Sequence, residues 1–396
     1  MRKLAIAAAI VIIAGALPAH AATIKTDNYT LRTFRWSDNR VAVTTFVAGN
    51  GFMLKKLNAY PTFSARKLTS TMGIESGSLA AVNGDFRWVG TNAPKHLSVI
   101  DGEVFSTGNQ PGWVLRTNAD GTRAVIGKPI FDATVTQGAV SFPLSGWNAQ
   151  QPGVRPPRYI PKGWPVAFTA RGGNDRYPSV SNCSALLAPV SGVHALHRRY
   201  EVVEIRRNCA RKPLQPPQGK YQWVVLHGTQ VGSLQLGRVH LRVGLGLGGT
   251  ARQVVGGVPQ VLKAGVNVGP ICPRHPCPKT GSGPDAPLYK NNPRTALGIS
   301  RGCPDLDPLT GCRYFLVTVD GRVSGWSEGV RFPALARLFI ELGAWDALNL
   351  DGGGSTTMWV RKRSDACQLR RSIGCLVNRP TYGERAILDG VGIVRG

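Results

Sequence analysis

Short runs of apolar and β-branched residues, separated by Gly and Asn turns, make up most of this chain. Runs of this length and pattern predict β-strands rather than helices. The predicted strands are Val41 to Val47, Leu79 to Val82, Leu97 to Ile100, Trp113 to Leu115, Tyr221 to Leu226, Arg294 to Ile299 and Tyr314 to Val319.

The clearest helix is predicted from Phe332 to Leu342, where apolar residues recur at helical spacing. Pro333 suits its first turn and Gly343 its end. A strand is expected next, from Ala347 to Leu350, and it runs directly into Asp351 and three consecutive glycines.

These glycines, Gly352, Gly353 and Gly354, are costly in chain entropy unless the backbone must approach something closely. Exposed amides in such a loop can bind an anion, and Ser355 and Thr356 add hydroxyl donors. We therefore expect a polar ligand here, at the carboxyl end of a strand, rather than a simple tight turn.

Three further polar clusters end apolar runs and are candidates for the same site. Each has an ordinary structural interpretation as well, because Asn-Gly and Asp-Gly favour hairpin turns and a surface Arg is common. A guanidinium at a strand start also suits two-pronged phosphate binding. The clusters are Asn83-Gly84-Asp85, Arg294-Thr295 and Asp320-Gly321-Arg322.

The first 21 residues have the composition of an export signal, with Arg2 and Lys3, an apolar core and a small-residue site ending at Ala21. No later segment has the roughly twenty apolar residues of a membrane span. We expect cleavage near Ala21 and a secreted or periplasmic protein of residues 22–396.

Eight cysteines agree with export, because an even number in an exported chain favours disulfides. We expect nearest neighbours to pair, since each pair brackets a stretch that resembles a surface loop. Zinc bound between Cys272 and Cys277 is an alternative, although no second ligand pair has finger-like spacing. The expected pairs are Cys183 with Cys209, Cys272 with Cys277, Cys303 with Cys312, and Cys367 with Cys375.

The chain carries 48 Lys and Arg against 22 Asp and Glu, a net charge of +26. Such a surface attracts anionic polymers, although charge that only maintains solubility would look the same. A basic, Pro-rich stretch from 151 to 220 is predicted to be an insertion, or alternatively an ordinary part of the sheet.

Other catalytic schemes find little support. The glycine run does not form a Gly-x-Ser-x-Gly elbow and does not end in the Gly-Lys-Ser/Thr of a P-loop. The histidines lack paired metal spacing, and His227 is the one candidate site member, with a buried structural role equally plausible. The aspartates around the glycine run are candidate ligands for Ca²⁺ or Mg²⁺, which prefer oxygen.

In their order along the chain, the four clusters resemble the phosphodiester glycosidase family, and the segment Val377 to Val394 is similar to its closing segment. The Asp-Gly-Gly-Gly-Ser run is the specific motif. The resemblance implies an α+β fold with a mixed, twisted β-sheet core, few flanking helices and one polar cleft. It also implies hydrolysis between a sugar's anomeric carbon and a phosphodiester oxygen, with a phosphorylated glycan or sugar phosphodiester as substrate. The sequence itself shows no feature that requires a cofactor.

Such hydrolysis needs a base or nucleophile at the anomeric carbon and stabilisation of the departing phosphate. We assign base or nucleophile work to Asp351 and Asp320, phosphate binding to Arg294, Arg322 and the amides of 352–355, and sugar hydroxyls to Asp85 with Asn83. The alternative is a non-enzymatic protein that binds anionic envelope glycans or nucleic acid through its basic surface.

Overall fold

The computed structural model describes residues 22–25, 29–49, 51–59, 61–62, 66–87, 93–108, 112–149, 163–172, 183–190, 197–209, 214–245, 251–270, 290–305 and 311–396. The predicted signal segment 1–21 and the pair Cys272 and Cys277 lie outside these residues. None of the helices described is long and apolar enough to cross a membrane.

A central sheet of eight strands positions three of the four polar clusters of the sequence, those at Arg294, Asp320 and Asp351. Every described ladder of this sheet is antiparallel. The expected mixture of parallel and antiparallel strands is therefore not found in the described part of the central sheet. In spatial order its strands are β1 (Ala22–Lys25), β2 (Tyr29–Trp36), β3 (Asn39–Val47), β23 (Arg313–Val319), β22 (Arg294–Ile299), β24 (Asp346–Asn349), β20 (Gln260–Lys263) and β21 (Val266–Asn267).

Both faces of the central sheet are covered, which explains why its middle strands are continuously apolar. All six residues of β22 are buried. The helix α4 (Phe332–Glu341) covers one face with Leu335, Leu338 and Phe339, as its spacing predicted. Apart from it, the described residues form only two short helices, α1 (Thr69–Glu75) and α3 (Gly302–Asp305), and the 3-10 turns η1 (Ala170–Gly172), η3 (Thr229–Ser233) and η4 (Gly353–Ser355).

A second sheet packs on the other face and carries the Asn83 motif at the end of one strand. In order it comprises β26 (Leu369–Arg370), β27 (Cys375–Leu376), β25 (Met358–Val360), β6 (Ala80–Asn83), β29 (Asp389–Arg395) and β4 (Phe52–Asn58). A small ladder joins β28 (Ala386–Ile387) to β5 (Lys67–Leu68). The shared core contains Leu31, Leu316, Leu348 and Ile393.

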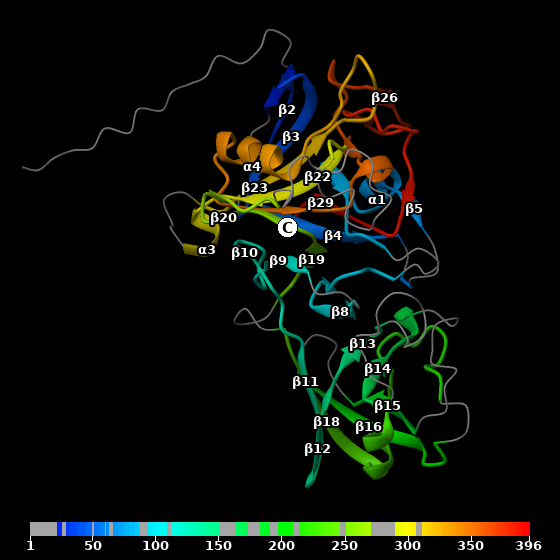
Figure 1. Ribbon diagram of the computed structural model, residues 1–396. Coiled ribbons are helices and arrows are strands. Elements are labelled where there is room, and N and C mark those ends of the chain that lie inside the picture. The colour runs from blue at the N-terminus through cyan, green and yellow to red at the C-terminus, as the bar shows by residue number, and fades with distance from the viewer. Residues whose placement is uncertain are drawn as a thin grey trace, which may run out of the picture.

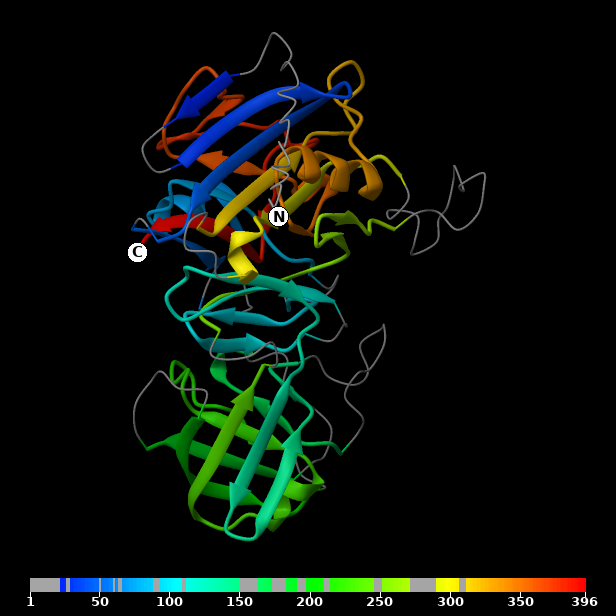
Figure 2. The same ribbon diagram turned by 90° about the vertical axis from the view of Figure 1, so that its left-hand side faces the viewer.

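The rest of the chain forms two further sheets, stacked below the first two in Figures 1 and 2. The middle sheet comprises β10 (Ala124–Gly127), β9 (Trp113–Thr117), β19 (Val254–Gly257), β7 (Ser98–Ile100) and β8 (Glu103–Ser106). Successive residues of a strand point to opposite faces. Accordingly Val255 joins the upper core and Val254 the lower one.

The distal sheet is built from residues 132–244, and the predicted insertion 151–220 lies inside this span. Its strands in order are β12 (Val140–Leu144), β11 (Asp132–Gln137), β18 (Gly237–Gly244), β16 (His197–Arg206), β15 (Ser184–Pro189), β17 (Val224–His227), β14 (Val166–Phe168) and β13 (Gly146–Trp147). The strand β18 alternates exposed and buried residues, so one face of this sheet meets solvent.

The described residues contain disulfides that join neighbouring cysteines in the sequence. One of them closes a loop between strands of the distal sheet, and two lie in the upper part of the molecule. Together they indicate an oxidising compartment. The bonded pairs are Cys183 with Cys209, Cys303 with Cys312, and Cys367 with Cys375, each as expected from the sequence.

Candidate functional site

The glycine loop, residues 351–357, lies where β24 leaves the central sheet and meets the end of β6. The Asp351 amide donates to the carbonyl of Gly84 over 3.0 Å. This bond brings the first and last motifs of the sequence together, although Gly84 and Asp351 are 267 positions apart along the chain (351 minus 84). The predicted convergence of these two motifs is therefore present in the structure.

Asn83 forms the junction between the motifs and is fully buried. Its Nδ2 donates to the Asp351 carbonyl over 2.6 Å, and its Oδ1 accepts from the Thr295 hydroxyl and the Thr357 amide. These bonds are directed within the protein, so Asn83 and Thr295 hold the loop in place. This differs from the expected role of contacting substrate.

The glycines are required by close packing on both sides of the loop. Gly353 has a φ of +59°, which side-chain-bearing residues rarely adopt. A Cβ on Gly353 would lie 3.2 Å from Nη1 of Arg322, and one on Gly354 would lie 3.0 Å from Nη2 of Arg385. The loop therefore brings its backbone directly against two guanidinium groups.

Three of the four loop amides donate within the protein, which corrects the predicted anion contacts of Gly352, Gly353 and Ser355. The Gly352 amide donates to Oδ1 of Asp351 over 2.9 Å, the Gly353 amide to the Pro293 carbonyl, and the Ser355 amide to the Gly352 carbonyl. Ser355 and Thr356 are buried, and the Ser355 hydroxyl donates to Asp351. Side chains are therefore the main donors that the loop offers to an anion.

Asp351 is partly exposed as a residue, although its carboxyl group lies in a largely desolvated environment. Desolvation by the surrounding protein raises its pKa to about 6, and nearby Asp85 acts in the same direction. The hydrogen bonds from Ser355 and Gly352 and the charge of Lys95 oppose this increase. A carboxyl group with such a pKa exchanges protons near neutral pH.

Arginines lie against the glycine loop that follows Asp351. Arg322, with a φ of +58°, directs its Nε and Nη2 at the amide oxygen of Asn292, over 3.0 and 2.7 Å. Arg322 and Arg385 are exposed, and neither forms an ion pair with the residues described. Both therefore present positive charge that no carboxylate of the described structure neutralises.

Arg87 belongs to the same cluster. Burial and the charges of Arg66 and Arg385 lower its pKa, while Asp351 raises it. Neither Arg87 nor Arg385 was among the predicted site residues. Their positions, two residues after Asp85 and directly before the final strands, were the available signal.

Arg294, by contrast, lies beneath the site rather than in it. It is buried, its Nε and Nη2 donate to the carbonyls of Val330 and Lys290, and its guanidinium lies 3.9 Å from the centre of the Phe332 ring. Burial, with the charge of Arg322, lowers its pKa to about 9. The structure therefore gives Arg294 a packing role instead of the predicted phosphate contact.

Asp320 directly follows β23, and hydrogen-bond donors satisfy both of its carboxylate oxygens. Its Oδ1 accepts from Asn378 Nδ2 and the Arg379 amide, each over 3.0 Å, and its Oδ2 accepts from Trp326 Nε1 over 3.0 Å. Burial nevertheless raises its pKa. The residue is 3% exposed, so the predicted role as a base or nucleophile is not supported by this position.

Asp85 is also enclosed, in a buried chain of charges behind the loop. Its Oδ1 lies 2.6 Å from Nδ1 of His96, and its amide donates to Asp389, which pairs with Lys56 over 2.7 Å. Burial raises the pKa of Asp85, but His96 and Lys56 together bring it below its usual range. Its side chain is fully buried, so the predicted contact with sugar hydroxyls is replaced by support of the loop.

Two further candidates lie elsewhere. His227 is buried in the distal sheet, where its Nε2 lies 3.1 Å from the Leu214 carbonyl and burial lowers its pKa to about 4. Among the residues described, no three His, Cys, Asp or Glu side chains gather into a metal site. Asp85 and Asp320 are satisfied by partners of their own, so the three predicted aspartates do not gather into one oxygen-rich group.

Comparison with known proteins connects this geometry to a family. Residues 221–394 match the model of the phosphodiester glycosidase family, which confirms the resemblance for that part of the chain. No curated protein matches the sequence.

Solved structures extend the similarity over most of the fold. A hypothetical protein from Synechocystis has 18% identity and a TM-score of 0.65 over 96% of this chain, which spans 64% of that protein. A putative exported protein from Burkholderia pseudomallei has 21% identity and a TM-score of 0.59, with 90% of this chain and 74% of that chain covered. The zebrafish N-acetylglucosamine-1-phosphodiester α-N-acetylglucosaminidase catalytic domain has 13% identity and a TM-score of 0.40, with 95% and 87% covered.

Proposed function

Since residues 221–394 belong to the phosphodiester glycosidase family, we propose that the protein is an exported hydrolase that cleaves a sugar-1-phosphodiester and releases the free sugar. One observation carries the proposal. Asp351, a partly exposed residue with a raised pKa, begins a loop whose backbone lies against Arg322 and Arg385, and neither arginine forms an ion pair among the residues described.

The arginines account for substrate binding. A phosphodiester is an anion, and guanidinium groups bind it through paired hydrogen bonds and charge. Arg322 and Arg385 flank the loop, so the phosphate fits between them with the sugar's anomeric carbon toward Asp351. The same positive charges stabilise the phosphate as it departs, which reduces the need for a strong general acid.

Asp351 acts as the base. Its carboxylate takes a proton from water, and the water oxygen forms a bond to the anomeric carbon. The bond from that carbon to the phosphate oxygen breaks, and its electron pair remains on the phosphate. The products are a free sugar and a phosphomonoester, and the proton leaves Asp351 to solvent or to product.

The test is a panel of sugar-1-phosphodiesters incubated with the protein and analysed for free sugar. We expect release from at least one sugar, a decrease of at least about a thousandfold for Asp351→Asn, and wild-type rates for the control Asp365→Asn. Asp365 is an exposed aspartate in the loop before Cys367 and is not part of the glycine loop. Release from no substrate, or full activity in Asp351→Asn, would overturn the proposal.

Salt distinguishes this function from that of a polyanion-binding protein. Binding through surface charge weakens steeply with ionic strength, whereas contacts in a partly buried site are screened less. We expect sugar release to persist in about 0.2 M salt.

A further inference from the structure

A second cavity opens on the face of the central sheet that carries α4, just beyond the end of this helix. Its volume is about 400 Å³, within the range of small-molecule sites. Val43 and Phe315 form its apolar floor and belong to the core beneath α4, while Leu342, directly after the helix, forms a wall. Lys25, Arg32 and Arg313 supply its charged groups.

The cavity is separate from the candidate active site. Arg313 begins β23, and Asp320 follows the last residue of that strand. Seven steps at about 3.3 Å each place the two residues on the order of 20 Å apart. A ligand in the cavity therefore occupies the opposite end of the sheet from the glycine loop.

Positive charge in the cavity has no acidic counterpart nearby. None of the described lining residues is Asp or Glu, and its three cations take part in none of the ion pairs found among the residues described. Arg32 is half-buried, with its guanidinium 5.3 Å from the centre of the Phe34 ring. Like charges gathered over an apolar floor repel one another, and an anion would relieve that repulsion.

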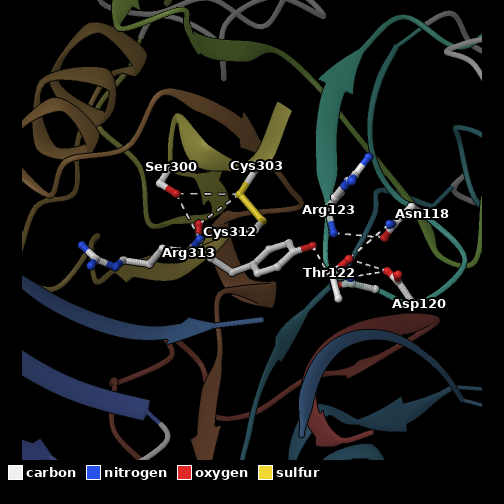
Figure 3. Close-up of a disulfide and its surroundings, with 10 residues drawn as sticks. Asn118, Asp120, Thr122, Arg123, Ser300, Cys303, Cys312 and Arg313 are labelled. Carbon is white, nitrogen blue, oxygen red and sulfur yellow. Dashed lines mark hydrogen bonds between the residues drawn. A yellow bond between two sulfur atoms is a disulfide. The ribbon is translucent and has the colours of Figure 1, made fainter. Parts of the chain in front are cut away.

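Arg313 is mounted on a rigid frame. It follows Cys312, which is bonded to Cys303, and its amide donates to the Ser300 hydroxyl over 3.0 Å. On the other side it pairs with Val47 of β3. Figure 3 shows its side chain extending away from the disulfide, on the side opposite Asp120. The backbone from which the Arg313 side chain extends is thus fixed on both sides.

We propose that this cavity binds a small organic anion that carries a phosphate or carboxylate group on an apolar body. The anionic group lies among Lys25, Arg32 and Arg313, where paired guanidinium hydrogen bonds suit its oxygens. The apolar body packs on Val43, Phe315 and Leu342, and Thr30 and Thr45 offer hydroxyls at the rim. The proposal does not rest on the hydrolase function.

Calorimetric titration of the full chain with hexyl phosphate tests this site. To silence the glycine-loop arginines, the titration uses an Arg322→Gln/Arg385→Gln background. We expect saturable binding with one ligand per chain. Adding Arg32→Gln and Arg313→Gln should weaken it at least tenfold, while Arg337→Gln, on the exposed face of α4 outside the cavity, should leave it unchanged. Thermal unfolding of each variant verifies that it is folded.

Three further ligands define the chemistry. Hexanol should not bind, and inorganic phosphate should bind at least tenfold more weakly than hexyl phosphate, because each lacks half of the recognised features. Co-sedimentation of the protein with phosphatidylglycerol vesicles identifies where the anion comes from. If co-sedimentation depends on Arg32 and Arg313, the anion is a lipid head group. If it does not depend on them while hexyl phosphate binding is intact, the anion is a free molecule. No saturable binding of hexyl phosphate, or equal losses in Arg337→Gln, overturns the proposal.

Discussion

Asp351 and Asp320 occupy equivalent places in the sequence pattern but opposite situations in the structure. Both follow the last residue of a central-sheet strand by no more than two positions, and both precede a glycine. Asp320 accepts hydrogen bonds from a tryptophan, an asparagine and a backbone amide, and it is 3% exposed. Asp351 is a partly exposed residue and begins a loop that lies against exposed arginines.

The comparison shows that an Asp-Gly pair at a strand end has two uses. Where surrounding donors satisfy the carboxylate, as around Asp320, the carboxylate has a structural role and connects loops through hydrogen bonds. Where the loop turns its glycines toward guanidinium groups, as after Asp351, the carboxylate stays available for chemistry. The difference depends on the donors that the fold brings in, not on the dipeptide.

Exchanging each carboxylate for an amide gives the largest contrast. Asp351→Asn should lower kcat/KM by at least about a thousandfold with little loss of stability, because the Gly352 amide still finds an oxygen acceptor. Asp320→Asn should lower the free energy of unfolding by about 2–4 kcal/mol, since an NH₂ group would face donors. Its folded fraction should retain kcat within about threefold.

Urea unfolding and sugar-release kinetics on both variants measure this contrast. The interpretation would be wrong if stable, correctly folded Asp320→Asn lost activity as completely as Asp351→Asn.

The arginines give the next largest effect. Arg322→Gln and Arg385→Gln should each lower kcat/KM by about 10- to 100-fold, as expected for a lost charge-assisted contact to phosphate. Arg370→Gln, an exposed arginine on β26, is the matched control and should behave as the wild type. Steady-state kinetics with one responsive substrate provides the measurement, and equal effects in all three variants would point to general surface charge instead.

The dependence of activity on pH gives a smaller effect. A base with a pKa of about 6 is protonated below that pH, so kcat/KM should fall about tenfold per pH unit on the acid side. Lys95 lowers the pKa of Asp351, so Lys95→Met should move this limb upward by a few tenths of a unit or more, while Lys128→Met should not. A limb that stays in place in Lys95→Met would contradict the assignment.

Much of the upper fold was predictable from sequence. The apolar runs at Arg294–Ile299 and Arg313–Val319 form strands, and α4 spans Phe332–Glu341 within one residue of its predicted range. The glycine loop was found because three glycines in succession have few purposes. These signals are local, so a single sequence contains them.

The division of roles among polar residues was less predictable, because it depends on partners far away in the sequence. Asn83 resembled a turn residue, yet its amide is used by Thr295 and Thr357, more than 200 positions later. Asp85 is enclosed because its carboxylate contacts His96 and its backbone amide donates to Asp389. Arg385 carries no motif of its own and reaches the loop only through the path of the final strands.

The smallest expected effect is on the pH dependence of the free energy of unfolding, through the raised pKa of Asp351. The pKa of Asp351 is raised from its ordinary value near 4 to about 6, so the folded state holds this proton more tightly than the unfolded state. Stability from this group is therefore greatest below about pH 4 and is lost as the pH rises through about 6. For a partly exposed residue we expect a loss of about 1–2 kcal/mol between those values.

Asp351→Asn removes the titrating group and should flatten this part of the curve. The measurement is the free energy of unfolding in urea at pH 4.5 and pH 7.5, with Asp365→Asn as the control that retains the wild-type slope. Relative to wild type, Asp351→Asn should gain about 1–2 kcal/mol on going from the lower to the higher pH. An identical pH dependence in both variants would mean that Asp351 titrates normally, and its proposed role as a base near neutral pH would lose its physical ground.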